Sequence, residues 1–435
     1  MNVTRSYSHI RRRKRYSAPG PVTLFVCGLL SATQIQLIGY LSIVEIIFTV
    51  LTPYFLITRW RTLHHSRLWP FLVLILGWFA SAVVTDIVRE TELSLALKGA
   101  TTPLLWASAF ISMYFLLRER LDLIRWFVLG AAISGVVSLY IFKPGSIIGL
   151  EQKAGSAFDY NYRILIGVST TFVWAAVLFL YPRFRKLTFG IMIVFALLSF
   201  IEGSRSAGAV MFLAALLFAF SRQLFGPGAR TRQRQSNKRV AQLAIVGLIA
   251  VLSISEGYRY AVLDGWLGED EMQRYLSQSV SKVGILAGRS EFASAMFAIA
   301  DSPVIGHGSW ARDKKGYRLM GATALGMDLS HLRDTSELLI PAHSHLWGPW
   351  IANGFLGFVF WFYMLMFVVF FLVNDLPYAP KYLPFLLIFG LGALWSIIFS
   401  PVGFRPLAVA GFTFMIVIAE GVARIRLADR QVSRS

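Results

Sequence analysis

The chain has almost no sulfur chemistry and few acidic residues. Cys27 is the one cysteine among 435 residues, which excludes a disulfide framework and a thiolate metal site. There is no Walker A sequence, GxSxG elbow or HExxH motif, so P-loop, serine hydrolase and zinc protease sites of those types are excluded. The 23 aspartates and glutamates are outnumbered by 42 lysines and arginines, and the net charge is +19.

Long apolar runs are abundant instead. Hydrophobic residues make up 56% of the chain, far more than in a soluble domain. About twelve windows are long enough to cross a hydrocarbon core of about 30 Å. They lie at 20–36, 39–57, 69–87, 99–117, 121–142, 164–181, 187–201, 206–221, 240–256, 346–373, 382–400 and 405–423. The sequence therefore predicts an all-α polytopic membrane protein with about twelve transmembrane helices.

The basic residues gather on one side of these windows. With the N-terminus inside, the inner segments hold 26 of the 42 lysines and arginines. Their acids are only Glu119, Asp122, Asp375 and Asp429. This is a positive-inside pattern, which predicts that both termini are cytoplasmic. Membrane orientation thus accounts for the basic excess, and we expect a lipid bilayer and no nucleic acid as a partner.

The predicted organisation has one long outer loop. In order, we expect a basic cytoplasmic tail (1–19), spans one to nine (20–256), a periplasmic loop domain (257–345), spans ten to twelve (346–423) and a cytoplasmic tail (424–435). The loop domain is nearly neutral. Apolar residues at helical spacing predict helices at 271–287 and 290–300, followed by the turn cluster DSPVIGHG and then irregular chain. The charged stretches 264–271 and 311–316 are typical of solvated surface.

Ionisable side chains near membrane depth are costly, and four places on the predicted outer side concentrate them. They are Arg205 in EGSRS, Arg289 with Glu291 in GRSE, the pair His343 and His345, and Lys153, Asp159 and Arg163 before the sixth span. Each has an ordinary explanation as well. An arginine at a span end can snorkel, an Arg and Glu can form a surface pair, and a histidine at a helix start is more often structural than catalytic.

If these groups converge, two arginines and a histidine suit a substrate that leaves as a diphosphate. Guanidinium forks bind phosphate oxygens bidentately and remain charged in a partly dry site. Histidine, with an ordinary pKa of about 6.5, can accept the proton of an attacking hydroxyl near neutral pH. A metal held by His343 and His345 is a weaker interpretation, since the histidines have no carboxylate beside them. A metal held by Glu269, Asp270 and Glu271 is also weaker, because three adjacent acids at the start of a loop are more often solvated. We therefore expect neither metal nor cofactor.

Three motifs resemble those of a known family. GRSEFASAMFAIADSPVIGHG looks like an arginine-led helix followed by an Asp/x/Pro/x/x/Gly/x/Gly turn, and EGSRSAG looks like a short Gly/Ser/Arg hairpin. His343, Ser344 and Gly354 fit a ligase signature of His, then Asn, Ser or Gln, then Gly after nine residues. With about twelve spans and one late periplasmic loop, the chain resembles the O-antigen ligase and O-antigen polymerase superfamily of bacterial inner-membrane glycosyltransferases.

The resemblance implies a reaction and roles. A glycan would pass from undecaprenyl diphosphate to an acceptor hydroxyl on the periplasmic face, either of lipid A core or of a growing glycan, without metal or nucleotide. Arg205 and Arg289 would hold the diphosphate, His343 would act as base or orient the acceptor, and His345, Glu291, Arg163 and Asp159 would support them.

The alternative is a flippase for a lipid-linked oligosaccharide or a transporter of an anionic solute. The outer turn TQIQLIG lacks the catalytic acid of older membrane oligosaccharyltransferases.

Overall fold

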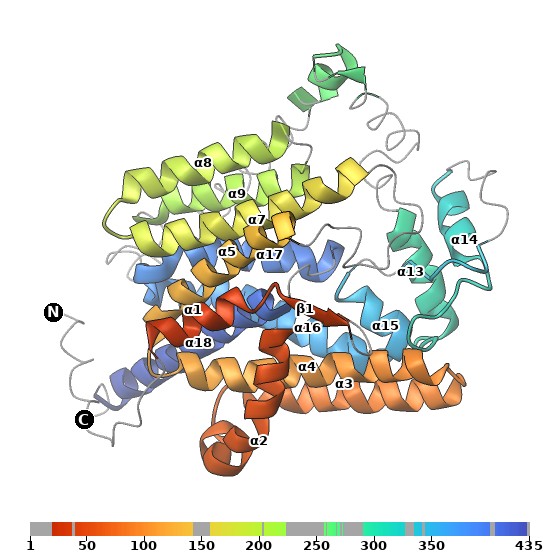
Figure 1. The fold of residues 1–435 in the computed structure, drawn as a ribbon, viewed down its shortest axis with the longest axis horizontal. Helices are drawn as coiled ribbons and strands as arrows, with labels where there is room; N and C mark the ends of the chain where they lie inside the picture. The colour runs from red at the N-terminus through yellow and green to blue at the C-terminus, as the bar shows by residue number, and fades with distance from the viewer. Residues whose placement is uncertain are drawn as a thin grey trace.

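The structure is a computed structural model, and it describes most of the chain. The described residues are 20–36, 40–141, 157–201, 204–222, 256–257, 259–266, 268–269, 272, 290–326, 335–341, 344–400 and 405–432. Over these residues the fold is helical apart from a small hairpin (Figure 1).

The long helices are, in chain order, α2 (Ile43–His64), α3 (Trp69–Val88), α4 (Leu93–Leu117), α5 (Ile124–Ile141), α7 (Ala157–Leu180), α8 (Arg185–Ile201), α9 (Arg205–Ala219), α16 (Phe355–Phe370), α17 (Leu383–Phe399) and α18 (Arg405–Val432). The shorter elements are α1 (Pro21–Leu29), strands β1 (Gln34–Gln36) and β2 (Tyr40–Ser42), α13 (Ser290–Asp301), α14 (Tyr317–Ala324) and α15 (Trp347–Asn353). There are also short 3-10 helices at Leu121–Leu123, Leu376–Tyr378 and Pro380–Tyr382, and a π-helical segment at Phe371–Asp375.

Six described segments are long and apolar enough to cross a membrane. They are Ile43–His64, Trp69–Val88, Leu93–Leu117, Phe355–Tyr378, Pro380–Phe399 and Arg405–Ala428. Each overlaps a predicted window, and α5, α7, α8 and α9 overlap four more. The predicted window 346–373 is divided at Gly354 into α15 and α16. The predicted window 240–256 lies outside the described residues except for its last position. The chain is therefore an all-α protein with the helices of a membrane protein, and the count of about twelve spans stays a prediction.

The first window, 20–36, is helical over a shorter stretch than predicted. α1 has nine residues, which reach about 14 Å at 1.5 Å per residue. Ser31 ends it by donating its hydroxyl to the Gly28 carbonyl (2.5 Å), and the polar chain that follows pairs as the antiparallel hairpin of β1 and β2. α1 packs on α5 through Gly28 and Gly130, where a side chain on either residue would overlap the other helix.

The helices run up and down, so the bundle has two ends. At the loop end, the end of α3 and the end of α17 meet the chain between 302 and 347. The start of α18 meets the start of α2 there. At the tail end, Tyr114 near the end of α4 donates a hydrogen bond to Glu420 of α18 (2.7 Å). In Figure 1 the helices α13, α14 and α15 stand together at the loop end.

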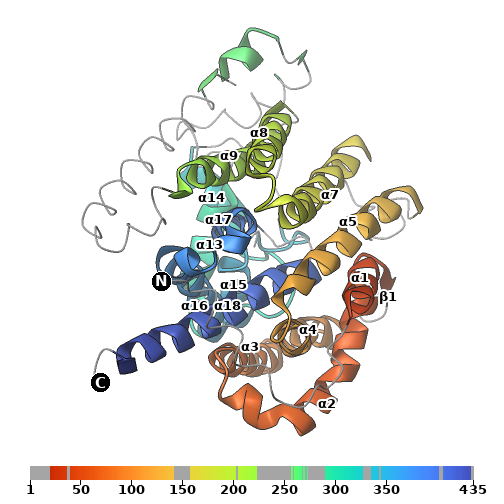
Figure 2. The ribbon, with the colours of Figure 1, turned by 90° about the vertical axis from the view of Figure 1, so that its left-hand side faces the viewer.

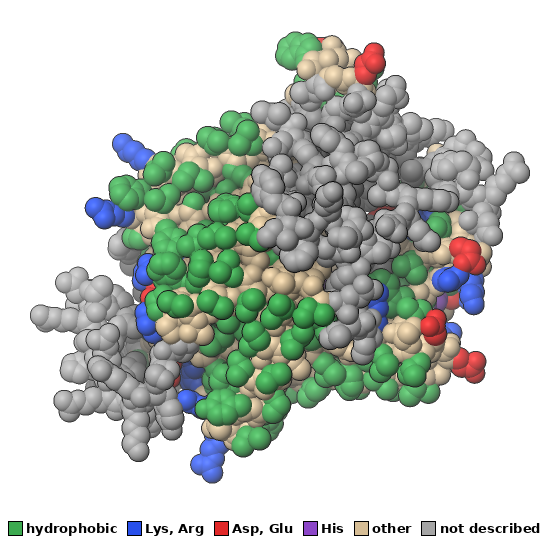
Figure 3. Space-filling model, in the orientation of Figure 1, with side chains coloured by type: hydrophobic (Ala, Val, Ile, Leu, Met, Phe, Trp, Pro, Cys, Tyr) green, Lys and Arg blue, Asp and Glu red, His purple; other side chains and the backbone are tan. Residues whose placement is uncertain are grey.

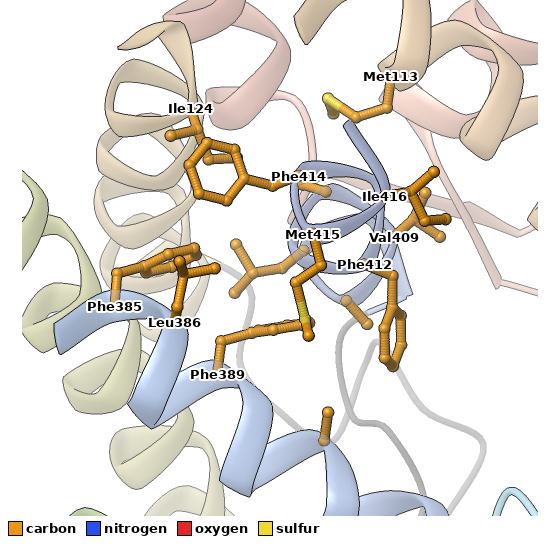
Figure 4. Packing of buried hydrophobic residues seen from close by; sticks show 14 of the residues in the cluster. Met113, Ile124, Phe385, Leu386, Phe389, Val409, Phe412, Phe414, Met415 and Ile416 are labelled. Carbon is orange, nitrogen blue, oxygen red and sulfur yellow. The ribbon is translucent and has the colours of Figure 1, made fainter. Parts of the chain in front are cut away.

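The core lies between two groups of helices. Figure 2 shows α16, α17 and α18 between α3 and α4 on one side and α7, α8 and α9 on the other. Figure 4 shows its aromatic centre, where Phe385 and Phe389 of α17 meet Phe412 and Phe414 of α18. On the outside, Figure 3 shows an apolar band across the middle of the visible face, with Lys and Arg at its left edge and charges of both signs at its right edge. A bilayer fits such a band.

The loop domain differs from the sequence prediction in one part. α13 confirms the predicted helix at 290–300, whereas the predicted helix at 271–287 lies outside the described residues save for position 272. The chain predicted to be irregular after the turn contains α14, so that prediction was wrong. Asp313 starts α14 by accepting hydrogen bonds from Tyr317 N (2.7 Å) and Arg318 N (2.9 Å). Asp313 is fully buried, although it was predicted to be solvated.

Candidate functional site

The three residues predicted to carry the chemistry belong to segments at the loop end. Arg205 is the first residue of α9, and its backbone alone is described. Arg289 and His343 lie outside the described residues. Each is followed directly by described chain, since Ser290 begins α13 and Ser344 leads into α15. The location of the predicted site can therefore be followed through these neighbours.

Two of these segments meet at the C-terminal end of α17. α9 packs on α17, and Val210 lies 4.0 Å from where a Cβ on Gly392 would be. Arg205 is five residues before Val210. Ile397 is five residues after Gly392, and its carbonyl accepts a hydrogen bond from Leu346 N (2.9 Å). The two helices run in opposite directions, so five residues back along α9 and five residues forward along α17 lead toward the same end of the bundle, and each distance is about 7.5 Å. The start of α9 therefore lies at the level of Ile397 and of Leu346, which is hydrogen-bonded to it.

The third segment reaches the same end of α17. The ring of Phe292, in the first turn of α13, lies edge to face on Trp347, with centroids 5.5 Å apart. Trp347 donates its indole N–H to the Ile398 carbonyl of α17 (3.1 Å), and its backbone N–H to the Ser344 hydroxyl (3.0 Å). The chain next to Arg205, Arg289 and His343 thus converges on one place.

The predicted turn cluster docks on the end of α15. His307 N donates to the Ile351 carbonyl (2.7 Å), Gly308 N donates to the Ala352 carbonyl (3.0 Å), and Phe355 N donates to the Val304 carbonyl (3.1 Å). The backbones approach so closely that only glycine fits at two points. A Cβ on Gly306 would lie 2.6 Å from Gly354 N, and a Cβ on Gly354 would overlap the Val304 carbonyl. Two motifs that are far apart in the sequence therefore form one joint.

Replacing Gly354 by alanine is expected to destabilise this joint. Gly354 has φ of +73°, in the left-handed region, and has no room for a side chain. We expect a loss of about 2 kcal/mol or more, from backbone strain and overpacking together. Thermal unfolding in detergent measures it. Gly392→Ala is the matched control, because the nearest atom to its Cβ is 4.0 Å away. Equal melting temperatures for the two variants would contradict the close packing of Gly354 against the Val304 carbonyl.

α3 holds this joint in the bundle, which the sequence did not predict. Asp86 is buried and accepts hydrogen bonds from the backbone N–H and the hydroxyl of Ser309 (both 2.7 Å). Arg89 donates to the Gly306 carbonyl (2.9 Å) and to the Ser302 hydroxyl (2.6 Å). One signal was available in the sequence. Asp86 is an acid inside an apolar window, and such a residue needs a partner.

His345 is placed very differently from a solvated base. Its ring lies against Trp361, with centroids 4.2 Å apart, and against Trp106 at 6.1 Å. Burial, together with the positive charge of Arg405, lowers the pKa of His345 to about 3. The imidazole is therefore neutral at physiological pH. This arrangement is that of a packing residue, and the supporting role predicted for His345 stays a prediction.

A buried ion pair lies beside this histidine. Arg405, the first residue of α18, donates its Nε–H to Glu45 in the first turn of α2. Glu45 also accepts a hydrogen bond from Ser42 N (2.9 Å), and the Ser42 hydroxyl accepts one from Glu45 N (3.3 Å). The turn TQIQLIG indeed has no acid, but an acid follows it by a few residues. Because Glu45 is fully paired, its arrangement is that of a structural carboxylate rather than a free catalytic acid.

The remaining predicted residues are placed in part. Asp159 and Arg163 lie in the first two turns of α7, where only their backbone is described, and Lys153 is outside the described residues. Glu291 lies in the first turn of α13 and is half-buried. In the described part of the chain, no three His, Cys, Asp or Glu side chains gather in a way that could hold a metal ion.

Comparison of the chain with family models, with curated proteins and with solved structures gave no match.

Proposed function

We propose that the protein is a metal-independent membrane glycosyltransferase, which moves a glycan from undecaprenyl diphosphate to a sugar hydroxyl at the loop end of the bundle. One observation carries the proposal: the described chain next to Arg205, Arg289 and His343 converges on the C-terminal end of α17. Three residues whose types suit departure of a diphosphate thus belong to segments that meet. The proposal includes a site on the periplasmic face of a bacterial inner membrane, with both termini cytoplasmic.

The chemistry assigned to these residues is a displacement at the anomeric carbon. The acceptor oxygen forms the new bond to that carbon, and its proton passes to His343. The bond from the carbon to the diphosphate oxygen breaks, and undecaprenyl diphosphate leaves with the electron pair. Arg205 and Arg289 bind the charge that grows on the leaving group. The apolar band beside the loop end lets the polyprenyl chain stay in the bilayer throughout.

The alternative, transport of a lipid-linked or anionic solute, has less support. Transporters commonly place ionisable groups near the bilayer midplane. Among the described helices, the buried carboxylates have partners close to an end of the bundle. Glu45 is paired with Arg405, Asp86 with Ser309, Asp375 with Arg426 (2.9 Å), and Glu420 with Arg424.

The proposal is tested by transfer in vitro. The purified protein is given a defined undecaprenyl diphosphate glycan, with lipid A core or a second lipid-linked glycan as acceptor. Glycan on lipid A core would identify a ligase, and a longer lipid-linked glycan would identify a polymerase of repeat units. Either product supports the proposal. If neither product forms with any acceptor, in lipid bilayers where the protein is folded, the proposal fails.

Replacing Arg289 by lysine is expected to slow transfer roughly tenfold or more, because lysine keeps the charge but loses the bidentate fork. The initial rate at limiting donor concentration measures this effect. Arg312→Lys is the control, because Arg312 is an exposed arginine of the same loop that pairs with the exposed Glu337. Equal transfer rates for the two variants would show that Arg289 does not bind the diphosphate of the donor.

A further inference from the structure

An apolar groove runs between α3 and α16 on the outside of the bundle. It is an open recess of about 470 Å³, and its lining residues are Pro70, Val73 and Leu74 from α3 and Val359, Phe362, Tyr363 and Met366 from α16. Phe71 closes it from behind, with its ring 4.9 Å from Tyr363 and 5.1 Å from Phe367. Both helices belong to candidate membrane spans. The groove therefore faces hydrocarbon.

The groove begins at the tail end of the bundle. Pro70 is in the first turn of α3, and the stretch from Val359 to Met366 on α16 extends about 10 Å. Val73, Phe362 and Met366 each expose between 45% and 49% of their surface. A recess of this shape and composition fits one segment of an acyl chain that enters from the tail-end leaflet.

A positive charge stands at the mouth of this groove. Arg67 precedes Pro70, a lining residue of the groove, by three residues and is 40% exposed. Its carboxylate neighbour, Asp375, is 3.8 Å away and has a closer partner in Arg426 at 2.9 Å. The exposed part of Arg67 can therefore bind a further anion while Arg426 remains paired with Asp375.

The surroundings of Arg67 are those of a membrane interface. Trp60 and Trp69 lie edge to face with centroids 5.2 Å apart, and His64 lies on Trp69 at 5.0 Å. Tryptophan belts mark the headgroup level of a bilayer. The segment 58–68 contains Arg59, Arg61 and Arg67 and no acid. The headgroup region at this end is therefore basic and complements anionic lipid.

We propose that the groove between α3 and α16 binds one acyl chain of an anionic phospholipid, and that Arg67 binds its phosphate. The groove and the charge at its mouth support this site, and lipid binding there does not depend on glycosyl transfer. The lipid would fill the recess between the two helices and link α3 to α16 at the tail end.

The test compares lipids at fixed protein concentration. The full chain is placed in nanodiscs of phosphatidylcholine alone and of phosphatidylcholine with phosphatidylglycerol, and bound lipid is counted by native mass spectrometry after release. We expect one phosphatidylglycerol retained per chain and a higher melting temperature in its presence. Equal retention of both lipids would overturn the recognition of an anionic headgroup, and retention of neither would overturn the site.

Two pairs of variants locate the lipid. Arg67→Gln is expected to weaken phosphatidylglycerol binding roughly fivefold, the effect of one basic residue at an anionic surface. Arg120→Gln is its control, since Arg120 is 42% exposed at the same end and also pairs with an acid. Val73→Trp should fill the groove and abolish retention. Val84→Trp should not, because Val84 is 55% exposed on the same face of α3 beyond the groove. If either variant matches its control, the assignment fails.

Discussion

Replacing His343 by alanine is expected to reduce glycosyl transfer by about 10²–10⁴-fold, the usual effect of removing a general base. The acceptor hydroxyl is a weak nucleophile until its proton is taken, and alanine cannot take it. The donor should still bind, because the two arginines remain. The rate of product formation with saturating donor measures the effect, and membrane insertion and melting temperature show whether the variant is folded.

His65→Ala is the matched control for this variant. His65 is exposed at the tail end, where its ring nitrogen contacts the Arg61 carbonyl (2.7 Å), far from the predicted site. Its loss should leave transfer unchanged. A folded His343→Ala protein that transfers glycan as fast as His65→Ala would remove the base from the mechanism.

Replacing Glu45 by alanine is expected to destabilise the protein by about 3–5 kcal/mol, the effect of removing one partner of a buried ion pair. Glu45 is buried, and Arg405 is held largely inside the bundle. Without Glu45, the guanidinium would remain at the start of a helix, where a positive charge is already unfavourable. The capping box of α2 would be lost as well. The melting temperature in detergent measures the change.

Two comparisons make the result specific. Glu256→Ala removes an exposed acid that pairs with Arg259 at 3.2 Å, and should change stability by about 1 kcal/mol at most. The double change of Glu45 and Arg405 to alanine should be less destabilising than the sum of the single changes, because neither charge is then left alone. If Glu45→Ala and Glu256→Ala had equal melting temperatures, the ion pair of Glu45 and Arg405 would contribute nothing to stability.

The apolar windows predicted the long helices because hydrophobic runs of this length have few other structures available. α13 was also predictable, since its apolar residues recur at helical spacing up to the break at Pro303. α1 was overestimated, because the window averaged across Ser31, Thr33 and Gln34, where the chain turns into a hairpin. α14 was missed because its start depends on Asp313, a charged residue that tertiary contacts bury.

The candidate site was predictable as a set of residue types, and less so as an arrangement. Gly354 was found from its spacing to His343, but its partner, the backbone at Val304 and Gly306, is set by how the loop folds back. The pair of Glu45 and Arg405 joins residues 360 positions apart, and no local pattern connects them. The low pKa of His345 follows from its burial, with tryptophans of two other helices against its ring, and from the charge of Arg405. Long-range contacts of this kind are decided by packing.

Measuring whether the bond between the glycan and the diphosphate is broken tests glycosyl transfer most directly. Proteoliposomes that contain the protein are loaded with undecaprenyl diphosphate bearing a labelled glycan, and an acceptor is added outside. Free undecaprenyl diphosphate and glycan joined to the acceptor are then measured together. We predict that both appear in equal amounts and that both are lost with His343→Ala. If the label crosses the bilayer with its diphosphate linkage intact and no acceptor product forms, the protein is a transporter and the account is contradicted.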